Sequence, residues 1–215
     1  MPDLPYDALE ASQLLAGRDP ALGAWIARVG PPRIEVRPDE MVPALLRSIT
    51  YQQLSTKAAA TIHGRVLEAF APDGAEPDAL ARAVLEADDD ALRSSGLSRA
   101  KTAAVKDLSA RHLDGSLPSR AALLEMPDLE VVTALTAVRG VGVWTAQMVM
   151  IFNLGRPDVW PVADLGVQEG MRVIHGLEDR PTAKEMAPIG EPYAPWRSVA
   201  AWYGWRAVHI ARGEE

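Results

Sequence analysis

Two closely spaced glycines offer the first chemistry that this sequence could perform. Gly140 and Gly142 flank the apolar Val141 and interrupt a helical pattern. Glycine permits a tight turn, so the backbone N–H groups of this turn and of the following helix start could approach a ligand closely. Such N–H groups bind anions, and phosphate above all, without any charged side chain. Taken alone, however, a Gly-x-Gly pair is more typical of an ordinary turn between two helices.

One carboxylate stands out after this turn. Asp164 follows Trp144 by twenty positions (144 to 164) and directly precedes an apolar helix that we expect to begin at Leu165. A well-placed carboxylate can stabilise a developing positive charge or orient an attacking water molecule. An isolated aspartate before a helix is ordinarily an N-cap or a surface charge. The two roles are compatible, and the residues alone leave both open.

Tryptophan is the third chemically suggestive residue type. The chain has six tryptophans, and Trp196, Trp202 and Trp205 lie close together near its C-terminal end. A tryptophan face attracts a cation by about 0.5–2 kcal/mol and also stacks on bases. Packing in the core is the alternative, and we favour it for Trp196 and Trp202; the sequence does not decide for Trp160.

Composition limits the classes of protein to which these residues could belong. The 215 residues carry a net charge of −7, so a broad cationic surface for nucleic acid is not expected. Any binding of nucleic acid must then depend on local geometry, such as backbone amides. The sequence contains no cysteine, which excludes disulfides, thiolate metal sites and cysteine nucleophiles. Without a signal peptide or a long apolar run, we expect a cytoplasmic protein that does not span a membrane.

The elements that must position these residues are predicted to be helices. Apolar residues recur at helical spacing along most of the chain, for example at Val42, Leu45, Leu46 and Ile49. Ser119 is a predicted N-cap. The one alternating stretch, residues 33–37, predicts a short strand or an extended linker. Proline and glycine are frequent between residues 155 and 195, where we expect irregular structure between two helices.

Several stretches together resemble the helix-hairpin-helix DNA glycosylases, and specifically their alkylation-repair branch, the 3-methyladenine DNA glycosylase II type. The hairpin motif is Leu135-x4-Gly140-Val141-Gly142-x2-Thr145-Ala146, and the loop Trp160–Val167 resembles the family's Pro- and Asp-containing loop. Weaker or longer matches are found at residues 49–59, 96–101 and 193–203. The resemblance covers roughly residues 40–210 in the order expected for the family.

The resemblance implies an all-α, two-lobed fold with a hairpin at about residues 131–154 and a central cleft into which a damaged base is flipped. It divides the chain into an N-terminal remnant, residues 1–40, and a helical core, residues 41–215. It assigns Asp164 as the catalytic aspartate; Trp144, Met148 and Trp205 to the base pocket; and Gly140, Val141, Gly142, Thr145 and Gln53 to DNA binding. Met148 replaces a common tyrosine, which predicts a wider pocket. Gln53 stands where the family inserts a wedge, although a surface glutamine at a helix start is the alternative.

The implied reaction is hydrolytic excision of N3- or N7-methylated bases from double-stranded DNA, without cleavage of the DNA backbone. Relatives with lyase activity carry a lysine near the position of Trp144, whereas this chain has none between Lys106 and Lys184. We expect a monomer, associated with the nucleoid if the source is bacterial, that requires no cofactor. In the family, hairpin carbonyls hold a monovalent cation, and the matching residues are Thr136, Val138 and Val141.

Two other functions remain open on the sequence. The same hairpin occurs in binding modules that lack an active site, although such a module would need neither Asp164 nor the pocket tryptophans. A glycosylase for oxidised or deaminated bases would share all the motifs. An enzyme acting on a small molecule is a weaker alternative, because it leaves the hairpin unexplained.

Overall fold

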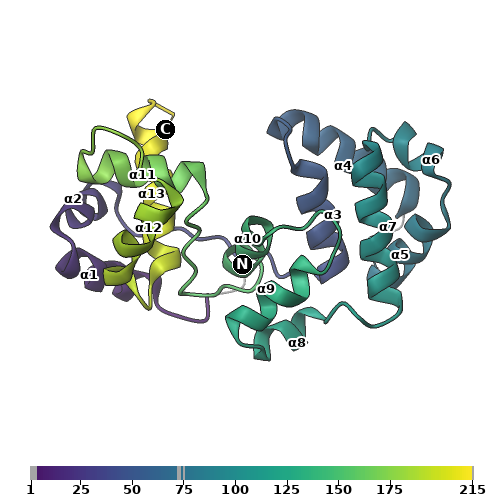
Figure 1. Ribbon diagram of the computed structural model, residues 1–215, viewed down its shortest axis with the longest axis horizontal. Helices are drawn as coiled ribbons and strands as arrows, with labels where there is room; N and C mark the ends of the chain where they lie inside the picture. The colour runs from purple at the N-terminus through teal and green to yellow at the C-terminus, as the bar shows by residue number, and fades with distance from the viewer. Residues whose placement is uncertain (1–3, 72–73, 75, 215) are drawn as a thin grey trace. The chain divides into compact units, whose positions relative to one another are not determined.

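A computed structural model describes residues 4–71, 74 and 76–214 of the chain. These residues form helices, turns and extended segments without a β-strand, which confirms the all-α prediction. The backbone divides into two compact units (Figure 1). Unit 1 contains the described parts of residues 1–37 and 150–215, and unit 2 contains those of residues 38–149.

Unit 1 is built around two long helices from the C-terminal half of the chain, α11 (Leu165–His175) and α13 (Arg197–Ala211), which pack against each other. The N-terminal helices α1 (Ala8–Arg18) and α2 (Pro20–Val29) pack onto α13, and α2 also contacts α11. Helix α12 (Ala183–Gly190) and a 3₁₀ turn, η1 (Glu191–Tyr193), complete the unit. The first two helices are therefore part of the packing of unit 1; that residues 1–40 are the remnant of a larger domain stays a prediction.

Two glycines allow the backbones of α11 and α13 to touch. A Cβ atom added to Gly170 would lie 2.2 Å from the carbonyl oxygen of Gly204 and 2.5 Å from its Cα atom. No side chain fits in that space, because real Cβ atoms do not approach other atoms so closely. The contact fixes the position of α13 against α11, and with it the side chains that α13 presents near the start of α11.

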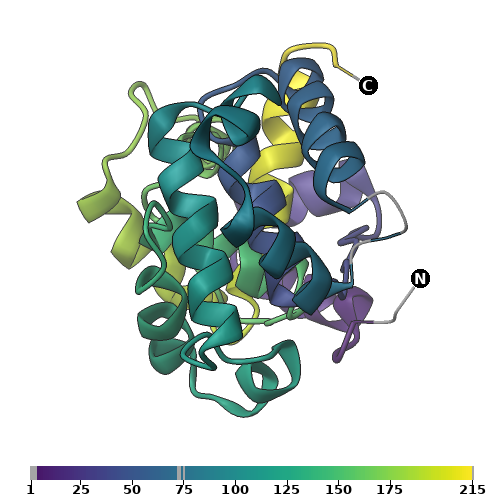
Figure 2. The same ribbon diagram turned by 90° about the vertical axis from the view of Figure 1, so that its right-hand side faces the viewer.

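Unit 2 contains the helices of the central sequence, which Figure 2 shows from a second direction. In chain order they are α3 (Met41–Tyr51), α4 (Thr56–Phe70), α5 (Pro77–Glu86), α6 (Asp89–Ser94), α7 (Arg99–Leu113), α8 (Arg120–Glu125), α9 (Asp128–Thr136) and α10 (Val143–Phe152). Helix α7 packs on α5 and α3. The last residues of α10, from Met150 onward, belong to unit 1.

The predicted apolar stripes face the core. Leu45, Leu46 and Ile49 of α3 are at most 1% exposed, which agrees with the spacing that predicted this helix. The hydroxyl of Ser119 accepts the N–H of Ala122 at 3.2 Å, so Ser119 is the N-cap of α8 as expected.

Residues 155–195 contain α11, which begins at Leu165 as predicted, and also α12, a helix where irregular structure was expected. The prediction gave too much weight to proline and glycine. Helix α12 begins with a capping box between Thr182 and Glu185, and it contains Pro188 in its interior. Gly170 is explained by the contact with α13, not by a break in the helix.

The alternating stretch at residues 33–37 is an extended segment without strand pairing. Ile34 and Val36 are buried, and the N–H of Arg37 donates to the carbonyl of Phe152 at 2.8 Å. The linker interpretation was therefore correct. No helix formed by the described residues is long and apolar enough to cross a membrane.

Candidate nucleic-acid interface and carboxylate site

The predicted hairpin is formed by α9, a turn and α10. The turn closes through a hydrogen bond from the N–H of Val141 to the carbonyl of Val138 at 3.0 Å. The carbonyl of Gly142 accepts the N–H of Ala146 at 3.0 Å, which begins the hydrogen bonding of α10. Both glycines are exposed, so the turn presents its backbone to solvent. This is the geometry that an N–H anion site requires.

The two hairpin glycines have different roles. Gly140 has a φ of +79°, a conformation that other residues rarely adopt, and an added Cβ would lie 3.2 Å from the Cβ of Ala104. Gly142 has no positive φ, and a Cβ there would meet no atom of the described residues within 4 Å. Of these two positions, the fold therefore requires glycine only at 140. The open space beside Gly142 is available to a ligand.

Two side chains not singled out in the sequence support this turn, one directly and one through the end of α3. The side-chain amide of Gln52 donates to the carbonyl of Gly140 at 3.0 Å. The amine of Lys101 donates to the carbonyls of Thr50 and Gln52, each at 2.8 Å, and burial lowers its pKa. Gln52 and Lys101 lie within the stretches 49–59 and 96–101 that matched the family, and this match was the signal for them.

Asp107 holds the start of the turn from the side of α7. Its Oδ2 atom accepts the backbone N–H of Arg139 at 2.8 Å and the Nε–H of Arg111 at 2.9 Å. Although desolvation opposes them, these hydrogen bonds and the nearby arginine charges lower the pKa of Asp107. No local pattern marks Asp107 in the sequence, because its partner at position 139 is distant along the chain.

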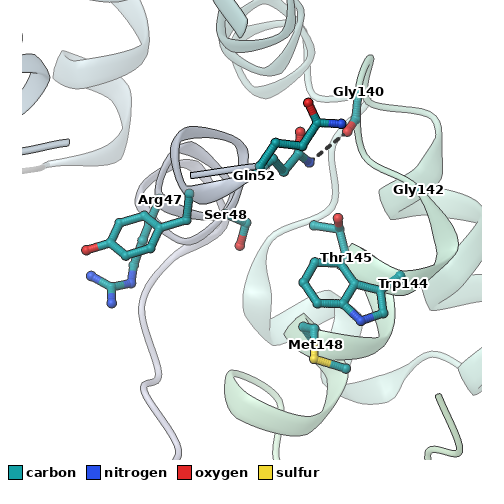
Figure 3. A pocket seen from close by; sticks show the side chains of 10 residues that line it. Arg47, Ser48, Gln52, Gly140, Gly142, Trp144, Thr145 and Met148 are labelled. Atoms are coloured by element: carbon teal, nitrogen blue, oxygen red, sulfur yellow. Dashed lines mark hydrogen bonds between the residues drawn. The ribbon is translucent and has the colours of Figure 1, made fainter. Parts of the chain in front are cut away.

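A pocket of about 480 Å³ lies beside the hairpin within unit 2 (Figure 3), a size typical of ligand sites. Trp144, Thr145 and Met148 of α10 line one side; Arg47 and Ser48 of α3, with Gln52 at its C-cap, line the other. Tyr51, Gln53, Gly140 and Gly142 complete the lining.

Trp144 is 45% exposed, which is unusual for so large an apolar side chain, whereas Thr145 is only 5% exposed. Trp144 and Met148 thus lie together at one pocket, and its role in holding a base stays a prediction. The guanidinium of Arg47 lies over the ring of Tyr51, 4.4 Å from its centroid.

Gln53 lies at the connection between α3 and α4 and has a φ of +56°. Among the described residues other than glycine, it is the one with a positive φ, a conformation that costs free energy. Such strain is commonly found at functional sites. Gln53 is exposed, and its neighbour Leu54 is 41% exposed. Gln53 thus lies in a strained, exposed turn that lines the same pocket as the hairpin, and the wedge role stays a prediction.

Asp164 lies in unit 1 at the N-cap of α11. Its Oδ1 atom accepts the N–H of Val167 at 2.8 Å and the indole N–H of Trp205 at 2.9 Å. The residue is only 7% exposed. Capping, the ordinary role for such an aspartate, is therefore present, but the cap hydrogen bond does not account for the burial or for the second donor. The carboxylate is held in a fixed orientation, as a group that must face a reaction centre would be.

The loop before Asp164 is itself held in place. The side-chain amide of Gln168 donates to the carbonyl of Val162 at 2.8 Å, and the N–H of Asp164 donates to that of Pro161 at 2.9 Å. The indole N–H of Trp160 donates to the carbonyl of Met186 at 2.7 Å, and Trp160 is 7% exposed. Trp160 is therefore a structural residue, which the sequence did not decide.

The remaining tryptophans differ in their surroundings. Trp196 and Trp202 are half-buried and pack against Tyr6 and Tyr203, respectively, so the expected packing role fits both. Trp205 is also half-buried and packs on Phe152, but it makes the hydrogen bond to Asp164 as well. Its assignment to the base pocket stays a prediction.

The residues inferred to bind a monovalent cation offer the type of ligand atom that such an ion requires. Thr136 is the last residue of α9, where carbonyls lack intrahelical partners and the helix dipole is negative. The carbonyl of Val138 accepts one N–H, which leaves a second lone pair for an ion. Carbonyl oxygens are suitable ligands for Na⁺ or K⁺.

A helix-hairpin-helix turn with an exposed backbone, together with a buried carboxylate on a fixed loop, defines a class of base-excision proteins. The chain belongs to the HhH-GPD superfamily of base excision DNA repair proteins, whose family model matches residues 46–195.

Individual relatives narrow this class. DNA-3-methyladenine glycosylase 1 of Schizosaccharomyces pombe is 31% identical over 180 residues, which cover 84% of this chain and 78% of the relative. The crystal structure of a DNA-3-methyladenine glycosidase from Bacillus halodurans superposes with a TM-score of 0.84 at 31% identity, covering 95% of this chain and 91% of the other. A structure of the Schizosaccharomyces pombe 3-methyladenine DNA glycosylase in complex with abasic DNA gives a TM-score of 0.79 at 28% identity, covering 92% and 95%.

Proposed function

We propose that the protein is a DNA glycosylase that excises alkylated bases, in particular purines methylated at N3 or N7, in base excision repair. The observation that carries the proposal is Asp164, a buried carboxylate whose Oδ1 atom accepts two N–H donors at the start of α11. A binding module would need no such group. The names of the relatives, 3-methyladenine glycosylases, support the class of substrate.

The chemistry of the substrate suits a single carboxylate. A purine methylated at N3 or N7 carries a positive charge, which weakens its glycosidic bond. As the C1′–N bond breaks, its electron pair returns to the purine ring and neutralises it, while positive charge develops on the sugar. The Asp164 carboxylate stabilises that charge and orients a water molecule. The water oxygen bonds to C1′ and its proton is released, which leaves a free base and an abasic site.

The hairpin supplies the grip on DNA in this proposal. The backbone N–H groups of Gly140, of Gly142 and of the start of α10 bind phosphate oxygens, while that of Val141 closes the turn on Val138. Such binding explains how a protein of net charge −7 holds a polyanion. Thr145, in the first turn of α10, is buried, so we expect it to act through the packing of the hairpin and not by direct contact with DNA. Gln53 enters the duplex at the place that the flipped base vacates, and its side chain hydrogen-bonds the orphaned partner base.

The exposed face of Trp144, with Met148 beside it, contacts the flipped base. A tryptophan face favours a cationic purine over a neutral one by about 0.5–2 kcal/mol. Arg47 lines the same pocket, but its guanidinium lies over Tyr51. We therefore expect selectivity for cationic lesions to come from Trp144 and from the reactivity of the leaving group.

We further propose that the enzyme has no lyase activity. Lyase chemistry needs a lysine amine at the sugar, and Trp144 stands at the hairpin exit where such a lysine would lie. Lys101 has a lowered pKa, but its amine already donates to two backbone carbonyls. Water is then the nucleophile.

In this proposal the protein acts as a cytoplasmic monomer on double-stranded DNA. It needs no cofactor beyond a structural Na⁺ or K⁺ at the carbonyls of Thr136, Val138 and Val141.

The test uses duplexes that each contain one defined lesion: 3-methyladenine, 7-methylguanine, hypoxanthine or 8-oxoguanine. We expect release of the two methylated bases, and strand breaks only after alkali treatment. Faster release of the neutral bases would transfer the assignment to oxidised or deaminated lesions. Binding to abasic DNA without release of any base would identify a non-catalytic module, and strand breaks without alkali would overturn the monofunctional assignment.

A further inference from the structure

We propose that Trp205 is a positioning residue for Asp164, and that Gly166 provides the space which brings the indole to the carboxylate. The proposal rests on the function proposed above for Asp164. It assigns the contribution of Trp205 to its indole N–H, which acts through Asp164, instead of to a ring face that contacts the base.

The hydrogen bond between the two side chains is direct. The Nε1–H of Trp205 donates to Oδ1 of Asp164 at 2.9 Å. The same Oδ1 atom accepts the backbone N–H of Val167 at 2.8 Å, so two donors from different helices fix one carboxylate oxygen. One donor alone allows the carboxyl plane to rotate about the N–H···O direction. A second donor from α13 restricts that rotation and holds the carboxylate in one orientation.

Gly166 makes this approach possible. A Cβ atom at position 166 would lie 2.8 Å from Cδ1 and 3.1 Å from Nε1 of Trp205, and 3.1 Å from Oδ1 of Asp164. Any other residue would therefore separate the donor from the acceptor or displace the indole. Gly166 has no positive φ, so its backbone does not require glycine. The space for the indole is the reason that the structure offers for a glycine in the first turn of α11.

Packing on a neighbouring ring and a neighbouring helix also holds the indole in place. Its ring lies 5.5 Å from that of Phe152, centroid to centroid, in a tilted arrangement. The contact between Gly170 and Gly204 fixes α13 on α11, one residue before Trp205. Trp205 has thus a defined place before any DNA binds. Pre-organisation of this kind is what a group that must meet a developing charge requires.

The decisive experiment is a double-mutant cycle on single-turnover release of 3-methyladenine. Trp205→Phe keeps an aromatic face and removes the donor, and we expect release to fall about 10- to 100-fold, as for other small misplacements of a reacting group. Affinity for abasic DNA should not change. In an Asp164→Asn background, Trp205→Phe should cause little further loss. An equal loss in both backgrounds would show that Trp205 acts independently of Asp164, and would overturn the proposal.

A second pair of variants separates the ring from its N–H. Incorporation of 3-benzothienylalanine at position 205 keeps the shape of the bicyclic ring and replaces the N–H by sulfur. We expect the same loss of release as for Trp205→Phe. Gly166→Ala should also reduce release, because it displaces the indole, while a higher helix propensity helps to maintain stability. Trp202→Phe, on the same helix, is the matched control and should leave release unchanged. Full activity of the benzothienyl protein would overturn the proposal.

A spectroscopic measurement tests the coupling without any activity. The indole N–H signals of the six tryptophans are recorded by ¹H–¹⁵N NMR, and the signal of Trp205 is assigned by its loss in Trp205→Phe. Asp164→Asn and Gly166→Ala should each shift that signal and leave that of Trp202 in place. An unshifted signal would refute the hydrogen bond. If the wild type releases no base but the shift is observed, the proposed function fails while the pairing of Asp164 with Trp205 stands.

Discussion

The turn that carries Gly142 and the helix start that carries Gly166 each place a glycine beside a candidate functional group, but for different reasons. Around Gly142 there is open space, and a methyl group would contact no atom within 4 Å in the part of the chain that the structure describes. Around Gly166, Trp205 and Asp164 already occupy the space that a methyl group would take. The turn proposed to bind DNA thus has room for a partner, whereas the carboxylate site is filled by the protein itself. A surface for binding must remain accessible, while a group for catalysis must be fixed in advance.

The largest expected effect is at the carboxylate site, around Asp164. Asp164→Asn removes the negative charge but keeps an oxygen that can accept the N–H groups of Val167 and Trp205. We expect single-turnover base release to fall about 10²- to 10³-fold, which is about 3–4 kcal/mol of transition-state stabilisation. Thermal stability should change little, because asparagine is nearly as good an N-cap.

Asp7→Asn is the matched control for that variant. Asp7 caps α1 with hydrogen bonds to the N–H groups of Leu9 and Glu10, and it has no proposed role in the reaction. It should leave both stability and release unchanged. Unaltered release by a well-folded Asp164→Asn protein would reduce Asp164 to a cap and remove the contrast between the two sites.

The next effect is on stability. Gly170→Ala places a methyl group 2.2 Å from the carbonyl oxygen of Gly204, where backbone atoms cannot easily move. We expect a loss of about 3 kcal/mol in the free energy of unfolding, measured by chemical denaturation. Gly142→Ala, measured in parallel, should leave that free energy within about 0.5 kcal/mol of the wild type. Equal losses would show that the two regions do not differ in packing.

The third effect is on DNA affinity. Because Gly142→Ala fits the free protein, any weakening of binding reports how closely DNA approaches the turn. We expect about a tenfold loss of affinity for abasic DNA, or about 1.4 kcal/mol, independent of DNA sequence. The salt dependence should be shallow, with a slope of about −0.9 for each of a few neutralised phosphates. Unchanged affinity, or the steep slope of a strongly basic protein, would argue against binding through backbone amides.

The smallest effect concerns pH, and it is confined to unit 2. Burial, and then the charge of Arg47, lower the pKa of His63, whose Nδ1 atom has no hydrogen-bond partner among the described residues. Since the unfolded chain takes up the proton first, the stabilisation is complete above a pH of about 6.5 and is lost as the pH falls below it. We expect His63→Gln to lose less thermal stability than the wild type between pH 7.5 and 5.5. An identical loss in both proteins would show that protonation of His63 does not contribute.

The sequence predicted the elements of each site but not the contacts that join those elements to one another. The helical spacing located α3, Ser119 identified a cap, and the glycine pair located the hairpin, since all of these are local patterns. The hydrogen bond between Asp164 and Trp205 joins residues 41 positions apart. The contact between Gly170 and Gly204 depends in the same way on how α11 and α13 cross. The positive φ of Gln53 is set by the connection of two helices, and no residue type signals it.

The division of unit 1 into two sequence segments has a consequence for synthesis on the ribosome. Helices α1 and α2 emerge first, but their partners α11 and α13 emerge only after all of unit 2. During translation, the apolar surfaces of α1 and α2 that later pack on α11 and α13 therefore stay exposed while unit 2 folds. Translation can be stalled when residue 160 has just left the ribosome. In that nascent chain we expect unit 2 to resist protease while α1 and α2 are still cleaved. Early protection of α1 and α2 would show that they find another partner first.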